Sequence, residues 1–421
     1  MRSFTNLMQT LLAEIKDRLD LLDHNGVVRH AKFPDVANKI KVAIGIRRAC
    51  KTYLCLQTAK QLLQDGVPLS RILYLNLEDD RLLPLTEQTL SHLIEAFYTL
   101  YPENHDQPCY LFLDEIQNVE NWPMVVRRFF DSRRTQIYLT GSSAKLLSKE
   151  IATVLRGRAI ALEVWPFNFT EYLAAQKVVI PPLLAAKKNQ DMLHQHFLKY
   201  LKEGGFPEVM GLSFEHQIQI LQDYVDVVIF RDIIERYGIT NVTLIKYLIK
   251  TLMNSVASRF SVNKYFNDLK SQGMSVSKNT LHEYMGYIED AFLAFTVPLF
   301  AESIRKVQTS PKKIYLVDSG LYYAYSNSFS QNLGRIFENF IYLELRRSKH
   351  EIHYYVTKSG YEVDFLTIDL HRKMKLYQIV WNIDDVETMN REQRALNEAK
   401  QELGIDGEIV TPHTFLEKLG V

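Results

Sequence analysis

Gly45-Ile-Arg-Arg-Ala-Cys-Lys-Thr52 has the form of a phosphate-binding loop in which Cys50 replaces the second glycine. Residues 40–44 before it are apolar enough for a short buried strand, and residues 53–63 after it have the apolar spacing of a helix. A phosphate-binding loop requires this order of strand, loop and helix. The stretch therefore predicts an α/β fold with a parallel sheet and a nucleotide bound at the loop.

The loop residues have the chemistry that ATP and magnesium require. Backbone N–H groups of such a loop point at the phosphates, and the positive end of the helix dipole favours the anion. We expect Lys51 to reach the β- and γ-phosphates and the Thr52 hydroxyl to bind Mg²⁺. The candidate cofactor-binding residues of this segment are Gly45, Arg47, Arg48, Ala49, Cys50, Lys51, Thr52 and Tyr53. The alternative is an ordinary strand-to-helix turn that happens to carry a lysine.

Two further strands are predicted to end in polar groups that suit this site. Residues 109–113 are apolar and are followed by the paired carboxylates Asp114 and Glu115. A carboxylate beside the phosphate loop can hold the water shell of magnesium, which suits Asp114, and Glu115 is the candidate base for the attacking water. Paired acids after a strand also begin loops or cap helices. Residues 136–139 form the third strand, and Thr140 places a hydroxyl where a sensor of the γ-phosphate would lie.

The order of these motifs resembles a known family, the bacterial and archaeal predicted ATPases of the AAA+-like P-loop class. The resemblance covers nearly the whole chain and rests on Arg47 and Arg48, Trp122, and residues 113–117, 139–143, 155–158, 165–172 and 204–208. It implies nucleotide, metal and hydrolysis roles for Lys51, Thr52, Asp114 and Glu115. It also implies that Arg156 or Arg158 senses or completes the site. The family has glycine at the position of Cys50, which predicts slow or impaired hydrolysis.

The composition is that of a folded intracellular protein. A chain of 421 residues with 47% hydrophobic residues is long enough for two or three separate cores. The formal net charge of +1 argues neither for nor against a nucleic-acid partner. No run of about 18 apolar residues is present, so we expect no membrane span. The three cysteines fit a reducing cytoplasm better than a disulfide framework, so we expect a cytoplasmic protein.

Where the motifs stop, the organisation of the chain changes. We expect an N-terminal helical lead-in, a P-loop ATPase domain, a helical and winged-helix domain, and a nuclease-like domain, at residues 1–35, 36–180, 190–310 and 311–421. Residues 262–270 and 277–288 predict two helices around a turn at Gly273, with Ser277 as N-cap of the second. This pair favours a winged-helix module, which the resembled family also has here.

A DNA-binding role for this module is the less favoured of two interpretations. A recognition helix should present basic or amide side chains to a groove. Lys278, Asn279 and His282 fit that requirement, but Glu283 and Glu289 follow on the same helix. We therefore place a structural or protein-interaction role ahead of DNA binding.

The last segment resembles the core of the PD-(D/E)xK nucleases. Such enzymes hold Mg²⁺ with carboxylates and place a lysine beside the attacking water. Glu338 on a predicted helix and Asp364 on a predicted strand fill the first two positions. Gln378 and Val380 stand where an acid and the lysine are needed, so we expect a nuclease-like fold without cleavage. The lysines that could reach this centre from elsewhere are Lys358 and Lys375.

Two hypotheses about function follow. The leading one is an ATP-binding switch with slow hydrolysis that alters how the C-terminal regions face a partner. The alternative is a nucleotide-free scaffold whose surfaces bind protein or DNA. Assembly of the chain with itself stays open, and Arg156 and Arg158 would act in trans only if subunits assemble.

Overall fold

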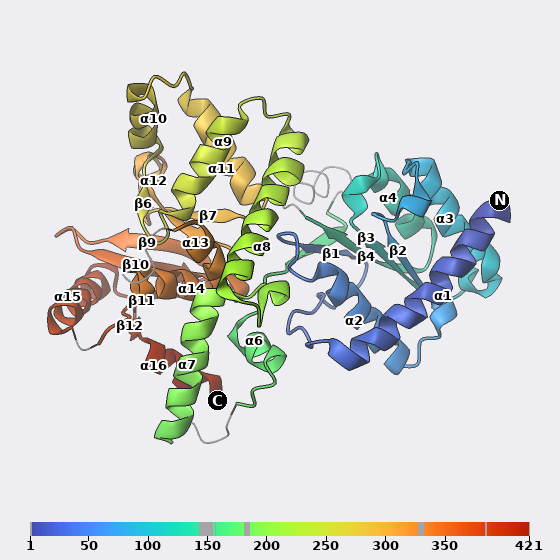
Figure 1. Ribbon diagram of the computed structural model, residues 1–421, viewed down its shortest axis with the longest axis horizontal. Coiled ribbons are helices and arrows are strands. Elements are labelled where there is room, and N and C mark those ends of the chain that lie inside the picture. Colours follow the sequence, from blue (N-terminus) through green and yellow to red (C-terminus); the bar gives the residue numbers. More distant parts are fainter. Residues whose placement is uncertain are drawn as a thin grey trace. The chain divides into compact units, whose positions relative to one another are not determined.

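The computed structural model describes residues 2–142, 155, 157–180, 186–326, 332–383 and 385–420 (Figure 1). These residues belong to two compact units, Met1–Trp165 and Pro166–Val421. The expected end of the ATPase domain, at residue 180, thus lies inside the second unit. Over the described ranges, none of the helices combines the length and the hydropathy that a bilayer span requires.

The first unit is built on a five-stranded sheet in which all neighbouring strands are parallel. Its order is β2-β3-β4-β1-β5, so β4 lies between the strand of the phosphate loop and the strand of the paired carboxylates. The strands are β1 Ile40–Ile44, β2 Ile72–Asn76, β3 Cys109–Asp114, β4 Thr135–Gly141 and β5 Ala159–Glu163. Because parallel strands bring their carboxyl ends to one edge, the candidate groups after β1, β3 and β4 meet there. The predicted α/β fold with a parallel sheet is confirmed.

Helices cover this sheet because its central strands are largely buried: β1 is buried at every residue and β3 at every residue except Tyr110. The helices are α1 Arg2–Asn25, α2 Lys51–Gln64, α3 Glu87–Leu100 and α4 Trp122–Ser132. Short 3₁₀ turns span Leu69–Arg71, Asp80–Leu82, Pro102–His105 and Ile116–Asn118. One core cluster joins α1 and α2 to the sheet through Ile15, Leu19, Cys55, Leu56, Ala59, Ile72, Tyr74, Phe112 and Tyr138.

The second unit begins with helices and continues into a small antiparallel sheet. The helices are α6 Phe169–Ala175, α7 Lys187–Glu203, α8 Phe214–Val227, the π-helix Val228–Glu235 and α9 Val242–Met253, with a 3₁₀ turn at Pro207–Val209. The next elements are β6 Arg259–Phe260, α10 Val262–Ser271, α11 Lys278–Asp290, β7 Ala294–Val297, α12 Ile304–Thr309 and β8 Lys312–Leu316. The sheet has the order β6-β8-β7. The predicted helix pair is present, and the Ser277 hydroxyl accepts from the Thr280 N–H at 3.0 Å.

A four-stranded sheet completes the second unit (Figure 1). Its elements are α13 Ser319–Tyr325, α14 Leu333–Arg347, β9 Glu351–Val356, β10 Glu362–Ile368, β11 Met374–Ile379, α15 Val386–Leu403, β12 Gly407–Val410, α16 Pro412–Glu417 and a 3₁₀ turn at Lys418–Gly420. The order is β12-β11-β10-β9, antiparallel except for the parallel pair of β11 and β12. The three strands predicted for this segment are therefore present.

The two sheets of the second unit are joined by backbone hydrogen bonds. Phe300 N–H donates to the Tyr354 carbonyl at 2.8 Å, and Tyr354 N–H donates to the Pro298 carbonyl at 3.0 Å. These bonds connect the segment after β7 to β9. Strand β8 pairs with β6 and β7, so the expected domain boundary at residue 311 falls inside the three-stranded sheet.

Candidate nucleotide-binding site

The phosphate loop has a backbone conformation that glycine favours at three positions. Gly45 has φ 151°, and a Cβ there would lie 2.1 Å from the Val164 carbonyl oxygen, so no side chain fits. Arg48 has φ 65° and Cys50 has φ 63°. For residues with a Cβ, the left-handed region costs about 1–2 kcal/mol. The loop is therefore strained at Cys50, the N-cap residue of α2.

Lys51 lies inside the loop rather than on its surface. Its side chain is buried, and Nζ donates to the carbonyl oxygens of Gly45 and Ile46 at 3.0 Å each. The loop thus wraps around an ammonium group at the N-terminus of α2. The first N–H groups of a helix have no intrahelical acceptor, so this end of α2 suits an anion. Thr52 is exposed on the first helical turn, and Tyr53 is half-buried.

The flanks of the loop are held by arginine side chains. Arg47 forms an ion pair with Glu78 at 3.4 Å, while Arg48 is exposed and Ala49 is buried. Arg29 is buried, and its guanidinium donates to the carbonyl oxygens of Ala49 at 2.8 Å and Trp165 at 2.7 Å. The sequence reasoning missed Arg29. An isolated basic residue in an irregular segment carries no periodic or motif signal.

Asp114 is held by hydroxyl groups from both neighbouring strands. The Tyr74 hydroxyl donates to Oδ2 at 2.7 Å, and the Thr140 hydroxyl donates to Oδ1. The Thr140 oxygen also accepts from the Glu115 N–H at 2.8 Å. Asp114 and Thr140 are both buried. A carboxylate has about four lone-pair sites, so this arrangement fixes Asp114 and leaves lone pairs for a hydrated magnesium ion.

The predicted site residues Asp114, Glu115 and Thr140 thus lie together, but Thr140 faces Asp114 through its hydroxyl. Tyr74 was missed by the sequence reasoning, because a tyrosine within an apolar strand is ordinarily core. Burial, together with the Asp114 charge, raises the pKa of the Tyr74 hydroxyl. Tyr74 therefore stays a hydrogen-bond donor throughout the physiological pH range. Burial likewise raises the pKa of the nearby Cys55 thiol, which keeps it uncharged beside Asp114.

Glu115 extends from the end of β3 in a left-handed conformation, with φ 54°. It is half-buried, and its Oε2 accepts from the side-chain amide of Gln117. Gln117 Oε1 is buried and has no hydrogen-bond partner within the part of the chain that the structure describes. The amide of Gln117 therefore orients Glu115, the candidate base. The Gln117 Oε1 remains available as a hydrogen-bond acceptor beside Glu115.

Of the two candidate arginines, only Arg158 can be placed relative to this site. Arg156 lies outside the described residues. The Arg158 carbonyl accepts from the Ile40 N–H at 2.8 Å, and its guanidinium bonds Asp131 at 3.0 Å. Ile40 begins β1, and the loop follows the end of that strand, about 15 Å away at 3.3 Å per residue. Arg158 thus lies at the amino-terminal ends of β1 and β5, at the opposite end of the strands from the phosphate loop.

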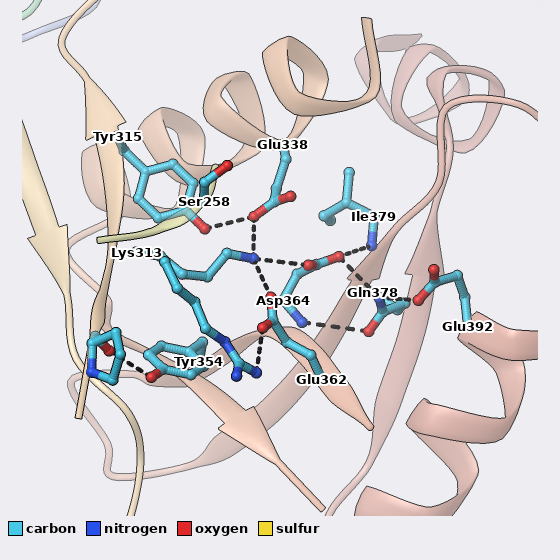
Figure 2. Close-up of polar contacts among 12 residues, drawn as sticks. Ser258, Lys313, Tyr315, Glu338, Tyr354, Glu362, Asp364, Gln378, Ile379 and Glu392 are labelled. Carbon is cyan, nitrogen blue, oxygen red and sulfur yellow. Dashed lines mark hydrogen bonds and ion pairs between the residues drawn. The ribbon is translucent and has the colours of Figure 1, made fainter. Parts of the chain in front are cut away.

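A second group of polar side chains lies in the four-stranded sheet (Figure 2). Glu338 on α14, Asp364 on β10 and Gln378 on β11 are brought together there, beside a cleft of about 630 Å³. Val380 is buried directly after β11. The structure adds Lys313 from β8, which bonds Asp364 at 3.0 Å and was missed by the sequence reasoning.

Of the two lysines that the sequence offered for this centre, Lys375 has another partner for its side chain and Lys358 is exposed. Lys375 pairs with Glu408 at 3.3 Å, and the Lys358 backbone N–H donates to Glu402 at 2.9 Å. Lys313 precedes Asp364 by 51 residues and belongs to the three-stranded sheet. No local pattern in the sequence could therefore connect it with this centre.

Known proteins match both parts of the chain. Residues 37–173 match the family model described as an AAA domain, and residues 194–332 match a domain of unknown function, DUF8612. The uncharacterized protein MJ1544 of Methanocaldococcus jannaschii is 34% identical over 397 residues, which cover 93% of this chain and 86% of that protein. An uncharacterized protein of Haemophilus influenzae is 30% identical over 328 residues, 78% of this chain and 79% of that protein.

The parallel sheet, the loop around Lys51 and the AAA-domain match define an AAA+-like P-loop ATPase fold. The chain belongs to the same family as MJ1544 and the Haemophilus protein. Among solved structures, the Walker-type ATPase PABY2304 of Pyrococcus abyssi matches with TM-score 0.43 and 12% identity, over 67% of this chain and 89% of that chain. The Orc1 protein of Aeropyrum pernix in complex with DNA matches with TM-score 0.30 and 12% identity, over 75% and 92%.

Proposed function

We propose that the first unit binds Mg-ATP at the phosphate loop and hydrolyses it slowly. The observation that carries this proposal is the position of Lys51, whose buried ammonium bonds the Gly45 and Ile46 carbonyls inside the loop. An ammonium at the N-terminus of a helix provides two independent sources of positive potential for phosphate oxygens. Lys51 and Thr52 would then bind the phosphates and magnesium, as in other P-loop enzymes.

In this proposal, the residues that support hydrolysis lie at the carboxyl ends of β3 and β4. Asp114 holds the magnesium water shell, because its carboxylate is fixed by Tyr74 and Thr140. Glu115 takes the proton of the attacking water, and Gln117 orients it. Thr140 acts as a positioning residue rather than as a direct phosphate contact. Arg158 acts only if a second copy of the chain brings it to this edge.

The C-terminal unit serves in this proposal as the partner-binding part. The order helix, strand, helix, helix, strand, short helix, strand from α9 to β8, with the sheet order β6-β8-β7, supports a winged-helix module. The order α14, β9, β10, β11, α15, β12 supports a nuclease-like domain without cleavage activity, because Gln378 and Val380 replace the acid and the lysine. ATP binding would change how this unit faces a protein partner.

Calorimetry with Mg-ATP tests the proposal. Wild-type protein is expected to bind with a dissociation constant below one millimolar, and Lys51→Ala to weaken binding at least tenfold, because a charge-assisted hydrogen bond contributes about 1.5–3 kcal/mol. Lys60→Ala is the matched control. It removes the same charge from the same helix, about 13 Å further along its axis. Absence of binding at millimolar nucleotide would reject the proposal in favour of a nucleotide-free scaffold. Equal binding in all three proteins would reject the loop around Lys51 as the binding site.

A further inference from the structure

Lys313 is a fully buried lysine surrounded by carboxylates (Figure 2). Its Nζ lies 2.5 Å from Glu338 Oε1, 2.9 Å from Glu362 Oε1 and 3.0 Å from Asp364 Oδ1. Glu338 extends from α14, and the other two acids extend from β10. An ammonium group has three hydrogens to donate, so these three contacts match its full donor capacity.

The oxygen of Asp364 that faces away from Lys313 is also occupied. Asp364 Oδ2 accepts from the Gln378 side-chain amide and from the Ile379 N–H, at 3.0 Å each. The same amide group of Gln378 donates to Glu392 Oε2 at 2.5 Å. In a metal-binding centre an acid at position 378 would supply lone pairs, whereas here the amide supplies hydrogens. Gln378 therefore donates hydrogen bonds to the acids instead of adding a metal ligand.

The other two acids around Lys313 have further donors of their own. The second oxygen of Glu362 pairs with the Arg259 guanidinium. Glu338 Oε1 also accepts from the Tyr315 hydroxyl at 2.6 Å. A magnesium ion requires oxygen lone pairs in near-octahedral geometry at about 2.0–2.1 Å. Most of these lone-pair directions are already occupied by donors from the chain itself.

The charges of the centre balance without an added ion. The acids are Glu338, Glu362, Asp364 and Glu392, and the cations that contact them are Lys313, Arg259 and Arg391. Burial, with the Asp364 charge nearby, raises the pKa of Glu338 to about 8, so this carboxyl keeps a proton near pH 7. Among the described residues, no group of three or more His, Cys, Asp or Glu side chains has an arrangement that could hold a metal ion.

We propose that Lys313 is the resident cation of this centre and takes the place that a divalent metal would occupy between Glu338 and Asp364. The acids bind an ammonium group of the same chain, and the centre is a metal-independent joint. Lys313 and Arg259 both belong to the three-stranded sheet, whereas their acid partners belong to α14 and β10. The joint therefore fixes the three-stranded sheet to the four-stranded sheet. The two sheets then offer their surfaces to a partner as one rigid body.

The first test uses the wild-type protein without nucleotide. Mn²⁺ binding is measured by electron paramagnetic resonance for wild type and Asp364→Asn, and supercoiled DNA is incubated with both in Mn²⁺. We expect the same Mn²⁺ isotherm for the two proteins and intact DNA. A wild-type Mn²⁺ site that Asp364→Asn removes, or nicking that Asp364→Asn abolishes, would overturn the proposal whatever happens to any lysine variant.

The second test removes the ammonium. Lys313→Gln is compared with Lys312→Gln, which neutralises the exposed neighbour on the same strand. Breaking a buried ion pair predicts a melting temperature about 10 °C lower for Lys313→Gln than for the control. Lys313→Arg, which keeps the charge, should recover part of the loss. Millimolar Mn²⁺ should raise the melting temperature of Lys313→Gln but not that of the control. A Lys313→Gln protein as stable as the control would overturn the proposal.

Discussion

At the scale of single residues, Cys50 is the position at which the phosphate loop departs from the usual glycine. It holds φ 63° and ψ 37° at the start of α2, a conformation that glycine adopts without strain. The cysteine has thus been accommodated by straining the backbone. In the proposed complex, the sulfur and Cβ would lie where the backbone approaches phosphate. The proposal of slow hydrolysis with retained binding rests on this backbone strain, since hydrolysis needs closer positioning of the γ-phosphate than binding does.

The variant Cys50→Gly tests this account of the loop. Closer positioning of the γ-phosphate in the transition state by restored N–H contacts contributes about 1–3 kcal/mol, which predicts a ten- to hundredfold gain in steady-state ATP turnover. Turnover is measured by phosphate release at saturating Mg-ATP. Cys55→Ala, which alters a buried thiol on the same helix, should leave turnover unchanged. An unchanged rate in Cys50→Gly would favour the nucleotide-free scaffold.

Glu338 makes the stability of the C-terminal unit depend on pH. Its pKa is raised by burial from 4.5 to about 8, so folding favours the protonated carboxyl. The stability it contributes is fully present below pH 4.5 and is lost as the pH rises through about 8. Urea unfolding at pH 6 and pH 9 should show a larger loss for wild type than for Glu338→Gln.

The control for this pH dependence is Glu387→Gln, which changes an exposed acid on α15 of the same unit. It should keep the wild-type difference between pH 6 and pH 9. Identical pH dependence in Glu338→Gln and wild type would contradict the protonated state of Glu338.

At the scale of elements, the edge of the five-stranded sheet gathers groups from strands that are adjacent in space rather than in sequence. Residues 45–52 were predicted because a phosphate loop is a local pattern bounded by a strand and a helix. Asp114 and Thr140 were predicted because each follows an apolar strand. Tyr74 and Lys313 were not predicted: Tyr74 meets Asp114 through the pairing of β2 with β3, 40 residues away, and Lys313 meets Asp364 across two different sheets, 51 residues away. Such contacts depend on tertiary structure, which the periodicity and spacing of residues in the sequence do not reveal.

Tyr74→Phe tests the link between β2 and the carboxylate of β3. The change removes the hydroxyl that donates to Asp114 and leaves a buried acceptor with one donor fewer, at a cost of about 1–3 kcal/mol. We expect a melting temperature lower by about 3–8 °C and several-fold weaker magnesium-dependent ATP binding, measured by calorimetry. Tyr138→Phe is the control, because its hydroxyl bonds Gln136 on the same sheet. Equal effects of the two variants on magnesium dependence would contradict the positioning role of Tyr74.

At the scale of the whole molecule, the chain joins a unit with a P-loop ATPase fold to a C-terminal unit whose two sheets are connected by hydrogen bonds and ion pairs. The backbone bonds between Phe300 and Tyr354 and the buried Lys313 contacts both connect these sheets. An ATP-dependent switch would therefore move the C-terminal unit as one body instead of moving its two sheets separately. The sequence predicted a winged-helix module and a nuclease-like segment in this unit. It did not predict the joint between the two sheets, because that joint depends on contacts between residues distant in sequence.

The central claim is that Mg-ATP binds at the loop around Lys51, and hydrogen–deuterium exchange of the full chain tests it most directly. Mg-ATP should slow amide exchange in peptides covering residues 45–54 of the wild type, because phosphate oxygens accept from N–H groups at the start of α2. The same peptides of Lys51→Ala should exchange at their nucleotide-free rate. Unchanged exchange over residues 45–54 in the wild type at millimolar Mg-ATP, or equal slowing in both proteins, would contradict the claim.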